Sequence, residues 1–250
     1  MNARTKTATD NRPLSADAEA QTIVEWLRKK GSKKVKDGMA RFAIPSDKAF
    51  GITVGDLRSH AKRFRTADAK TNHALALALW KTGWYEARML ACFVDEPALV
   101  TPAQMDEWRA DFDNWATCDA ACFVLFDRTP HAWSKVRAWA KLKPEFEKRG
   151  AFALLWGLTT HDKRSGDEPF LAGLALIEAA AEDGRNFVKK AVNMALRATG
   201  KRNANLHAAA IATAQRLARS NDATARWNGK DALRELQSAS VSRRVKSKER

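Results

Sequence analysis

The sequence predicts an all-α protein. Apolar residues recur at helical spacing in several long segments, and Val, Ile, Thr and the aromatic residues never gather in the alternating runs typical of strands. Alanine, the residue with the highest helix propensity, is abundant. Capping residues and prolines stand where helices are expected to begin, and glycines stand between the segments.

The start signals are clearest in the middle of the chain. In Thr101-Pro102-Ala103-Gln104, Thr is the expected cap, Pro takes the first helical position, and Gln is placed to reach back to the cap. Thr129-Pro130 repeats this pattern, and Pro144 and Pro169 mark two further helix starts.

The C-terminal part predicts unbroken helices, because no proline follows Pro169. Three segments carry apolar residues at helical spacing: 170–181, 186–199 and 204–219. The expected junctions between helices lie at Gly83, Gly150, Gly184 and Gly200.

The 250 residues suffice for one large domain. We expect a polar, flexible N-terminus over 1–14, a single helical domain over 15–238 and a basic, flexible tail over 239–250. Short loops predict antiparallel neighbours, and helix pairs recurring about every 35–45 residues would stack into a solenoid. No clean sequence repeat is visible, so a compact helical bundle is the alternative.

The charge balance points to a polyanionic partner. Lys and Arg number 44 against 29 Asp and Glu, a net charge of +15. Nucleic acid is the commonest partner of so basic a domain. The alternative is a surface whose charge serves solubility alone.

Other classes of function are disfavoured because their sequence motifs are absent. There is no dinucleotide or phosphate-binding glycine loop and no zinc-protease motif. The three cysteines are too few for a disulfide framework and fit a reducing cytoplasm, and the spacing of Cys118 and Cys122 fits buried thiols better than a metal site. No signal peptide and no apolar run of about 20 residues is present, so a membrane is not expected. His161-Asp162 is expected in a loop, with phosphate contact as a further option.

Trp115 and Asp119 form the pattern that best suggests chemistry. On a helix these residues are four apart and share a face. The indole face and the carboxylate both favour positive charge, which builds up on a sugar when its glycosidic bond breaks. The alternative is a core tryptophan beside an aspartate that caps a helix or pairs with an arginine. Nine tryptophans against one tyrosine, and basic clusters later in the chain, favour the functional interpretation.

The sequence from about residue 38 to 219 resembles the AlkD-type DNA glycosylases, bacterial alkylation repair enzymes built from HEAT-like helical repeats. The Trp115 and Asp119 pair is similar to the catalytic pair of that family, and Arg149 stands where the family has a phosphate-contacting arginine. The other matching stretches are 49–53 with Leu57-Arg58, 78–80 with 86–88, and 189–197.

The resemblance implies an all-α, curved solenoid of antiparallel helix pairs with a concave basic groove. It implies a monofunctional glycosylase that excises N3- and N7-alkylated purines from duplex DNA, without metal or nucleotide cofactor. Asp119 would then stabilise the cationic sugar and position water, Trp115 would pack on the deoxyribose, and Arg149 would hold a phosphate. Weaker DNA contacts are expected from Lys190 and Arg197.

One position departs from the family pattern. Met194 replaces a tryptophan that commonly faces the damaged nucleotide, so packing on a sugar is expected of it but no aromatic face is supplied. Nothing in the sequence requires more than a monomer. Two other classes of function stay open: a non-catalytic helical-repeat module that binds nucleic acid through charge, and a scaffold for an acidic protein partner.

Overall fold

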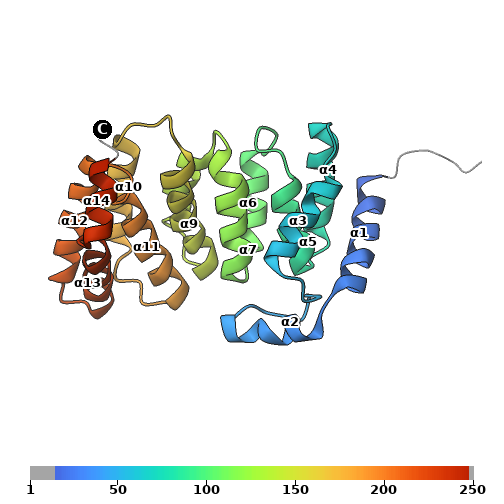
Figure 1. The fold of residues 1–250 in the computed structure, drawn as a ribbon, viewed down its shortest axis with the longest axis horizontal. Helices are drawn as coiled ribbons and strands as arrows, with labels where there is room; N and C mark the ends of the chain where they lie inside the picture. The colour runs from blue at the N-terminus through green and yellow to red at the C-terminus, as the bar shows by residue number, and fades with distance from the viewer. Residues whose placement is uncertain (1–14, 248–250) are drawn as a thin grey trace, which may run out of the picture.

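A computed structural model describes residues 15–247, and within this range every regular element is a helix. The helices form a row of antiparallel pairs stacked side by side, so the chain is an all-α solenoid of HEAT-like pairs (Figure 1). One layer contains α3 (Val54–Phe64), α5 (Tyr85–Val94), α7 (Trp115–Ala120), α9 (Glu145–His161), α11 (Asn186–Thr199) and α13 (Ala223–Leu236). The second layer contains α1 (Ala16–Lys30), α4 (Ala69–Lys81), α6 (Pro102–Ala110), α8 (Ala132–Trp139), α10 (Glu168–Ala179) and α12 (Ala204–Ala218).

The short α2 (Lys33–Gly38) and the 3-10 turn η1 (Ala40–Phe42) lie outside these layers, across one end of the neighbouring helices (Figure 1). The loop that follows is fixed by Glu86, whose buried carboxylate accepts hydrogen bonds from the backbone N–H groups of Phe50, Gly51 and Ile52. Gly51 adopts φ +87°, a conformation that favours glycine. The loop therefore delivers the chain to α3 in a fixed direction.

Most predicted helix starts are confirmed, with two local differences. Thr101 caps α6 through the N–H of Gln104 at 3.1 Å, but the Gln104 side chain donates to buried Asp95 instead of reaching back to the cap. Thr129 does not cap a helix, because its hydroxyl donates to the Phe126 carbonyl and α8 begins three residues later.

The helix after α7 widens before it ends. Ala121–Leu125 forms the π-helical turn η2, and Phe126–Arg128 forms the 3-10 turn η3. Cys118 and Cys122 are free, buried thiols, as the sequence predicts, and their sulfurs contact the carbonyls of Phe146 and Gly150 on α9. These contacts hold α7 and α9 in register.

The expected flexible tail differs from the structure. Ala239–Ser247 forms a further helix, α14, because Val241 and Val245 are four residues apart and bury their side chains against α12 and α13. The remaining tail residues, 248–250, and the expected flexible N-terminus, 1–14, lie outside the described residues. None of the described helices combines the length and apolarity required to cross a membrane.

Candidate functional site

Trp115 and Asp119 line a single groove, which we name the aromatic groove. It has a volume of about 430 Å³ and runs across successive helices of one layer, from α3 to α9. Among the described residues that line it, Asp119 is the one acid and Arg58 the one base. Its aromatic residues are Phe42, Tyr85, Phe93, Trp115, Phe123 and Trp156.

Helical spacing brings these side chains to one face. Trp115, Asp119 and Phe123 are successive members of an i, i+4, i+8 series along α7 and η2. Tyr85 and Phe93 belong to an equivalent series on α5, with Met89 between them. The groove is therefore an aromatic and aliphatic surface interrupted by one carboxylate.

Arg149 fixes the orientation of that carboxylate. Its Nε and Nη2 donate to Oδ1 and Oδ2 of Asp119 at 2.9 and 2.7 Å, a bidentate contact. Burial raises the pKa of Asp119, and the Arg149 guanidinium opposes this rise. The Asp119 side chain still keeps 16% of its surface exposed, so it reaches the groove, whereas Arg149 keeps 5%.

The structure shows Arg149 in contacts inside the protein, and none of these contacts reaches the surface where a phosphate would lie. Its third nitrogen, Nη1, donates to the Phe187 carbonyl on α11 at 2.8 Å, so both ends of the guanidinium are engaged inside the protein. The physical reason is that Asp119, 30 residues earlier, and Arg149 face each other across the α7–α9 contact. Arg149 is therefore a positioning residue for Asp119 in this arrangement.

Trp115 is also held by a specific contact. Its indole N–H donates to the Phe42 carbonyl at 2.7 Å, which ties η1 to the start of α7. The Trp115 side chain is half-buried and packs against the core. The remainder of the ring surface lines the groove, so the indole is presented in one orientation.

Lys190, Met194 and Arg197 share one face of α11 but do not line the aromatic groove. Lys190 is exposed, and Met194 is half-buried. Arg197 pairs with Glu235 on α13, which also pairs with Lys201 at 2.5 Å. The structure thus brings Trp115, Asp119 and Arg149 together and places these three residues on the second helix beyond α7 in the same layer.

Sequence reasoning missed Tyr85, Phe123 and Trp156 as groove residues. The signal was present for Phe123, which continues the four-residue spacing of Trp115 and Asp119. Tyr85 is the single tyrosine of the chain, and burial raises its pKa to about 12. Trp156 lies on α9, and only the packing of α7 against α9 brings it to the groove.

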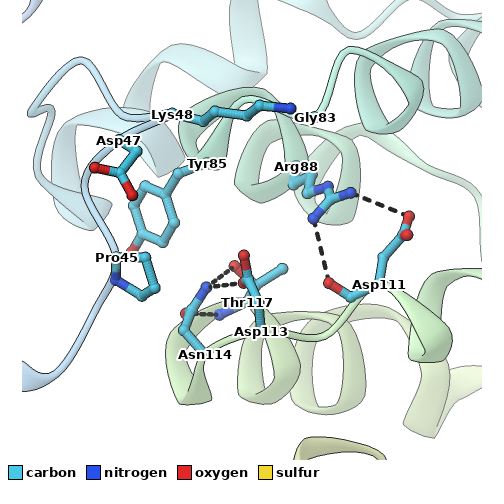
Figure 2. Close-up of a pocket in the computed structure, with 10 residues that line it drawn as sticks. All are labelled: Pro45, Asp47, Lys48, Gly83, Tyr85, Arg88, Asp111, Asp113, Asn114 and Thr117. Atoms are coloured by element: carbon cyan, nitrogen blue, oxygen red, sulfur yellow. Dashed lines mark hydrogen bonds and ion pairs between the residues drawn. The ribbon is translucent and has the colours of Figure 1, made fainter.

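Tyr85 also borders a second, polar pocket of about 380 Å³ at the N-terminal ends of α5 and α7 (Figure 2). Arg88 is engaged there, because its guanidinium contacts the side chain and the carbonyl oxygen of Asp111 at 3.1 and 3.2 Å. Asp47 and Asp113 also line the pocket, so its acids outnumber its bases, Lys48 and Arg88. This balance disfavours a phosphate there.

His161 and Asp162 lie at the end of α9 rather than wholly in a loop. His161 is the last helical residue, and Asp162 follows as the cap. The imidazole Nδ1 lies 2.5 Å from Oδ2 of Asp127, whose side chain is fully buried. Burial raises the pKa of Asp127 to about 6, and the contact with His161 opposes this rise.

This raised pKa predicts a pH-dependent stability. The carboxyl titrates near 3.8 when exposed and near 6 when buried, so the folded state binds more protons between these values. The favourable contribution of Asp127 to the free energy of unfolding is therefore complete below pH ~4 and is lost as the pH rises to ~6. We expect the Asp127→Asn variant to gain about 3 kcal/mol relative to the unmodified protein across this window, measured by urea unfolding. A constant difference from pH 4 to pH 7 would contradict the raised pKa.

Within residues 15–247, no three His, Cys, Asp or Glu side chains come together as a metal site would require.

Both the sequence and the fold of the chain are similar to those of known proteins. The model of a family described as DNA alkylation repair enzyme matches residues 23–236. A search of curated proteins gives no significant match. A solved structure from "a new family of proteins related to the HEAT-like repeat DNA glycosylases with affinity for branched DNA structures" matches with a TM-score of 0.69. At 18% identity, over 87% of this chain and 93% of that one, the match shows a shared fold.

Proposed function

The chain belongs to the DNA alkylation repair enzyme family, and from this premise we propose that it is a DNA glycosylase. The proposed reaction is hydrolysis of the N-glycosidic bond of N3- and N7-alkylated purines in duplex DNA. The observation that carries the proposal is the placement of Asp119: one oriented carboxylate in a groove otherwise lined by aromatic and aliphatic side chains and Arg58.

The chemistry needs little beyond such a carboxylate. An N-alkylated purine carries a positive charge, so it departs with the bonding electrons as a neutral base and requires no general acid. The sugar is left as an oxocarbenium-like cation, which water attacks to give the abasic hemiacetal and a released proton. A fixed negative charge beside the sugar stabilises this transition state more than the ground state.

The residues in and near the groove have different roles in this reaction. Asp119 faces the developing cation and accepts a hydrogen bond from the attacking water. Arg149 prevents the carboxylate from turning away, because its bidentate contact fixes both oxygens. Trp115, fixed by the Phe42 carbonyl, offers a flat apolar face for the deoxyribose. Lys190, which is exposed on α11, supplies a phosphate contact, Arg197 supplies another by exchanging its ion pair with Glu235 for a phosphate, and Met194 packs on a sugar.

Trp115 is predicted to contribute a smaller part of the rate than Asp119. We expect Trp115→Ala to slow excision about 5- to 30-fold, equivalent to the 1–2 kcal/mol of an aromatic–cation contact. Trp115→Phe keeps an aromatic face and should retain most of the rate, although it loses the hydrogen bond to Phe42. Single-turnover release of 7-methylguanine from alkylated duplex measures the excision rates of both variants. Equal rates for the alanine and phenylalanine variants would remove the role of the ring face.

A second candidate function is non-catalytic binding of DNA. Two observations favour it: Arg149 compensates the charge of Asp119, and Met194 offers no aromatic face. The structural neighbour is described by its affinity for branched DNA. If binding alone is the function, the protein should bind a four-way junction and alkylated duplex while releasing no base from either.

A further inference from the structure

A third cleft lies near the aromatic groove, where η3, the start of α8 and the α9–α10 loop meet. We name it the His161 pocket; its volume is about 530 Å³. Three exposed cations line it: Arg128 from η3, and Lys163 and Arg164 from the loop. Its lining acids are Asp127, whose Oδ2 contacts His161, and Asp162, whose carboxylate accepts hydrogen bonds from the loop.

Asp162 organises the loop that carries two of these cations. Its carboxylate accepts the backbone N–H groups of Arg164 and Ser165, both at 2.9 Å, and the indole N–H of Trp133 at 2.9 Å. The Ser165 hydroxyl donates to it at 2.6 Å. These four contacts satisfy the carboxylate inside the loop and leave the side chains of Lys163 and Arg164 exposed.

His161 contributes a ring of fixed orientation, whose Nε2 is a donor when the imidazole carries a proton on both nitrogens. Its Nδ1 is held by buried Asp127, which fixes the imidazole plane, and Nε2 has no hydrogen-bond partner within the described part of the chain. Gly157 makes this arrangement possible, because a Cβ at that position would lie 2.5 Å from Oδ2 of Asp127. The side chain of His161 keeps 27% of its surface exposed.

Phe123, which lines the aromatic groove, contacts His161 of the His161 pocket. The Phe123 ring lies 4.7 Å from that of His161 and 4.6 Å from that of Trp156, measured between centroids. Phe123 is one turn beyond Asp119, a rise of about 6 Å along the helix. Because about 6 Å already corresponds to roughly two nucleotides of a strand that rises about 3.4 Å per nucleotide, the His161 pocket, which lies beyond Phe123, is two or more nucleotides from Asp119.

We propose that the His161 pocket binds a backbone phosphate of the DNA strand whose sugar lies at Asp119. Arg128, Lys163 and Arg164 supply the charge, and His161, as an imidazolium that donates from Nδ1 to Asp127, donates a second hydrogen bond from Nε2 to a phosphate oxygen. This inference rests on the proposed function, since it uses the same strand. It assigns a phosphate contact to exposed cations, whereas Arg149 is buried and contacts Asp119 and the Phe187 carbonyl.

The test measures binding to undamaged duplex, so it does not depend on excision. We would compare the Lys163→Ala/Arg164→Ala variant with Arg137→Ala/Lys141→Ala, a control of equal charge change that alters exposed residues on and just after α8. Fluorescence anisotropy at several salt concentrations gives the slope of log K against log[salt]. Loss of one phosphate contact should reduce this slope by about 0.9 in the first variant and leave the control unchanged. Equal slopes in the two variants overturn the inference.

A second measurement follows His161 itself. In protein labelled with ¹⁵N-histidine, addition of duplex DNA should shift the His161 ring signals, identified by their loss in His161→Gln. His73 and His207 serve as internal references, because their rings contact Asp95 and the Gly200 carbonyl instead. A His161 signal that does not move while DNA binds overturns the inference and leaves the glycosylase proposal to the excision assay. Failure to bind duplex at any salt concentration overturns both.

Discussion

Asp119→Asn should release alkylated bases about 10²- to 10³-fold more slowly than the unmodified protein, the cost of removing one preorganised electrostatic contact from a transition state. Asparagine keeps the shape of the side chain but removes the negative charge that faces the sugar cation. DNA affinity should change little, because phosphate contacts supply most of it. The measurement is single-turnover release of 3-methyladenine and 7-methylguanine.

The matched control for this result is Asp113→Asn. Asp113 is exposed and lies six residues earlier in the polar pocket rather than in the aromatic groove. The substitution makes the same charge change as Asp119→Asn. Because it does so outside the aromatic groove, it should leave the rate of excision unaltered. An Asp119→Asn variant that is folded by circular dichroism and excises at the same rate as Asp113→Asn would remove the proposed role.

The Asp119–Arg149 ion pair should have the largest effect on stability. Removing one partner of a buried pair leaves the other charge uncompensated, which typically costs about 3–5 kcal/mol. Arg149→Met should therefore lower the melting temperature by about 6 to 20 °C in a chain of this size. The double variant Asp119→Leu/Arg149→Met has no buried charge at this position and should recover most of the loss.

The pH dependence of the single variant adds a second test of the pair. Burial raises the pKa of Asp119, and without Arg149 nothing in the described structure opposes that rise as strongly. An acid with a raised pKa favours the folded state at low pH, and this contribution is lost as pH rises through the raised value. The stability difference between Arg149→Met and the unmodified protein should therefore narrow as pH falls. A difference that is small and constant with pH would mean that the pair is not a significant contact.

Much of the fold was predictable from local signals. Thr101-Pro102, Pro144 and Pro169 mark helix starts because capping and the fixed φ of proline are properties of a few adjacent residues. The tail from Ala239 was not predicted as helical, because its basic residues obscure the two valines that bury it. That burial depends on α12 and α13, which the local sequence does not describe.

The site was predictable only where it depends on the spacing of residues within one helix. Trp115 and Asp119 share a face because four residues separate them, a relationship that the sequence states directly. The partner of Asp119 lies 30 residues away, and the sequence did not indicate that Arg149 pairs with it, because pairing across α7 and α9 depends on tertiary packing. His161 and Asp127 are likewise 34 residues apart, so their contact is invisible in the sequence.

The central claim is that the aromatic groove is a site of glycosidic bond hydrolysis, and base release tests it most directly. Purified protein is incubated with methylated duplex DNA, with Asp119→Asn purified in parallel to account for contaminating activity. The glycosylase account predicts free 3-methyladenine or 7-methylguanine and an equal amount of abasic sites with the unmodified protein alone. Tight binding to duplex or junction DNA with no base released would contradict it and favour the non-catalytic function.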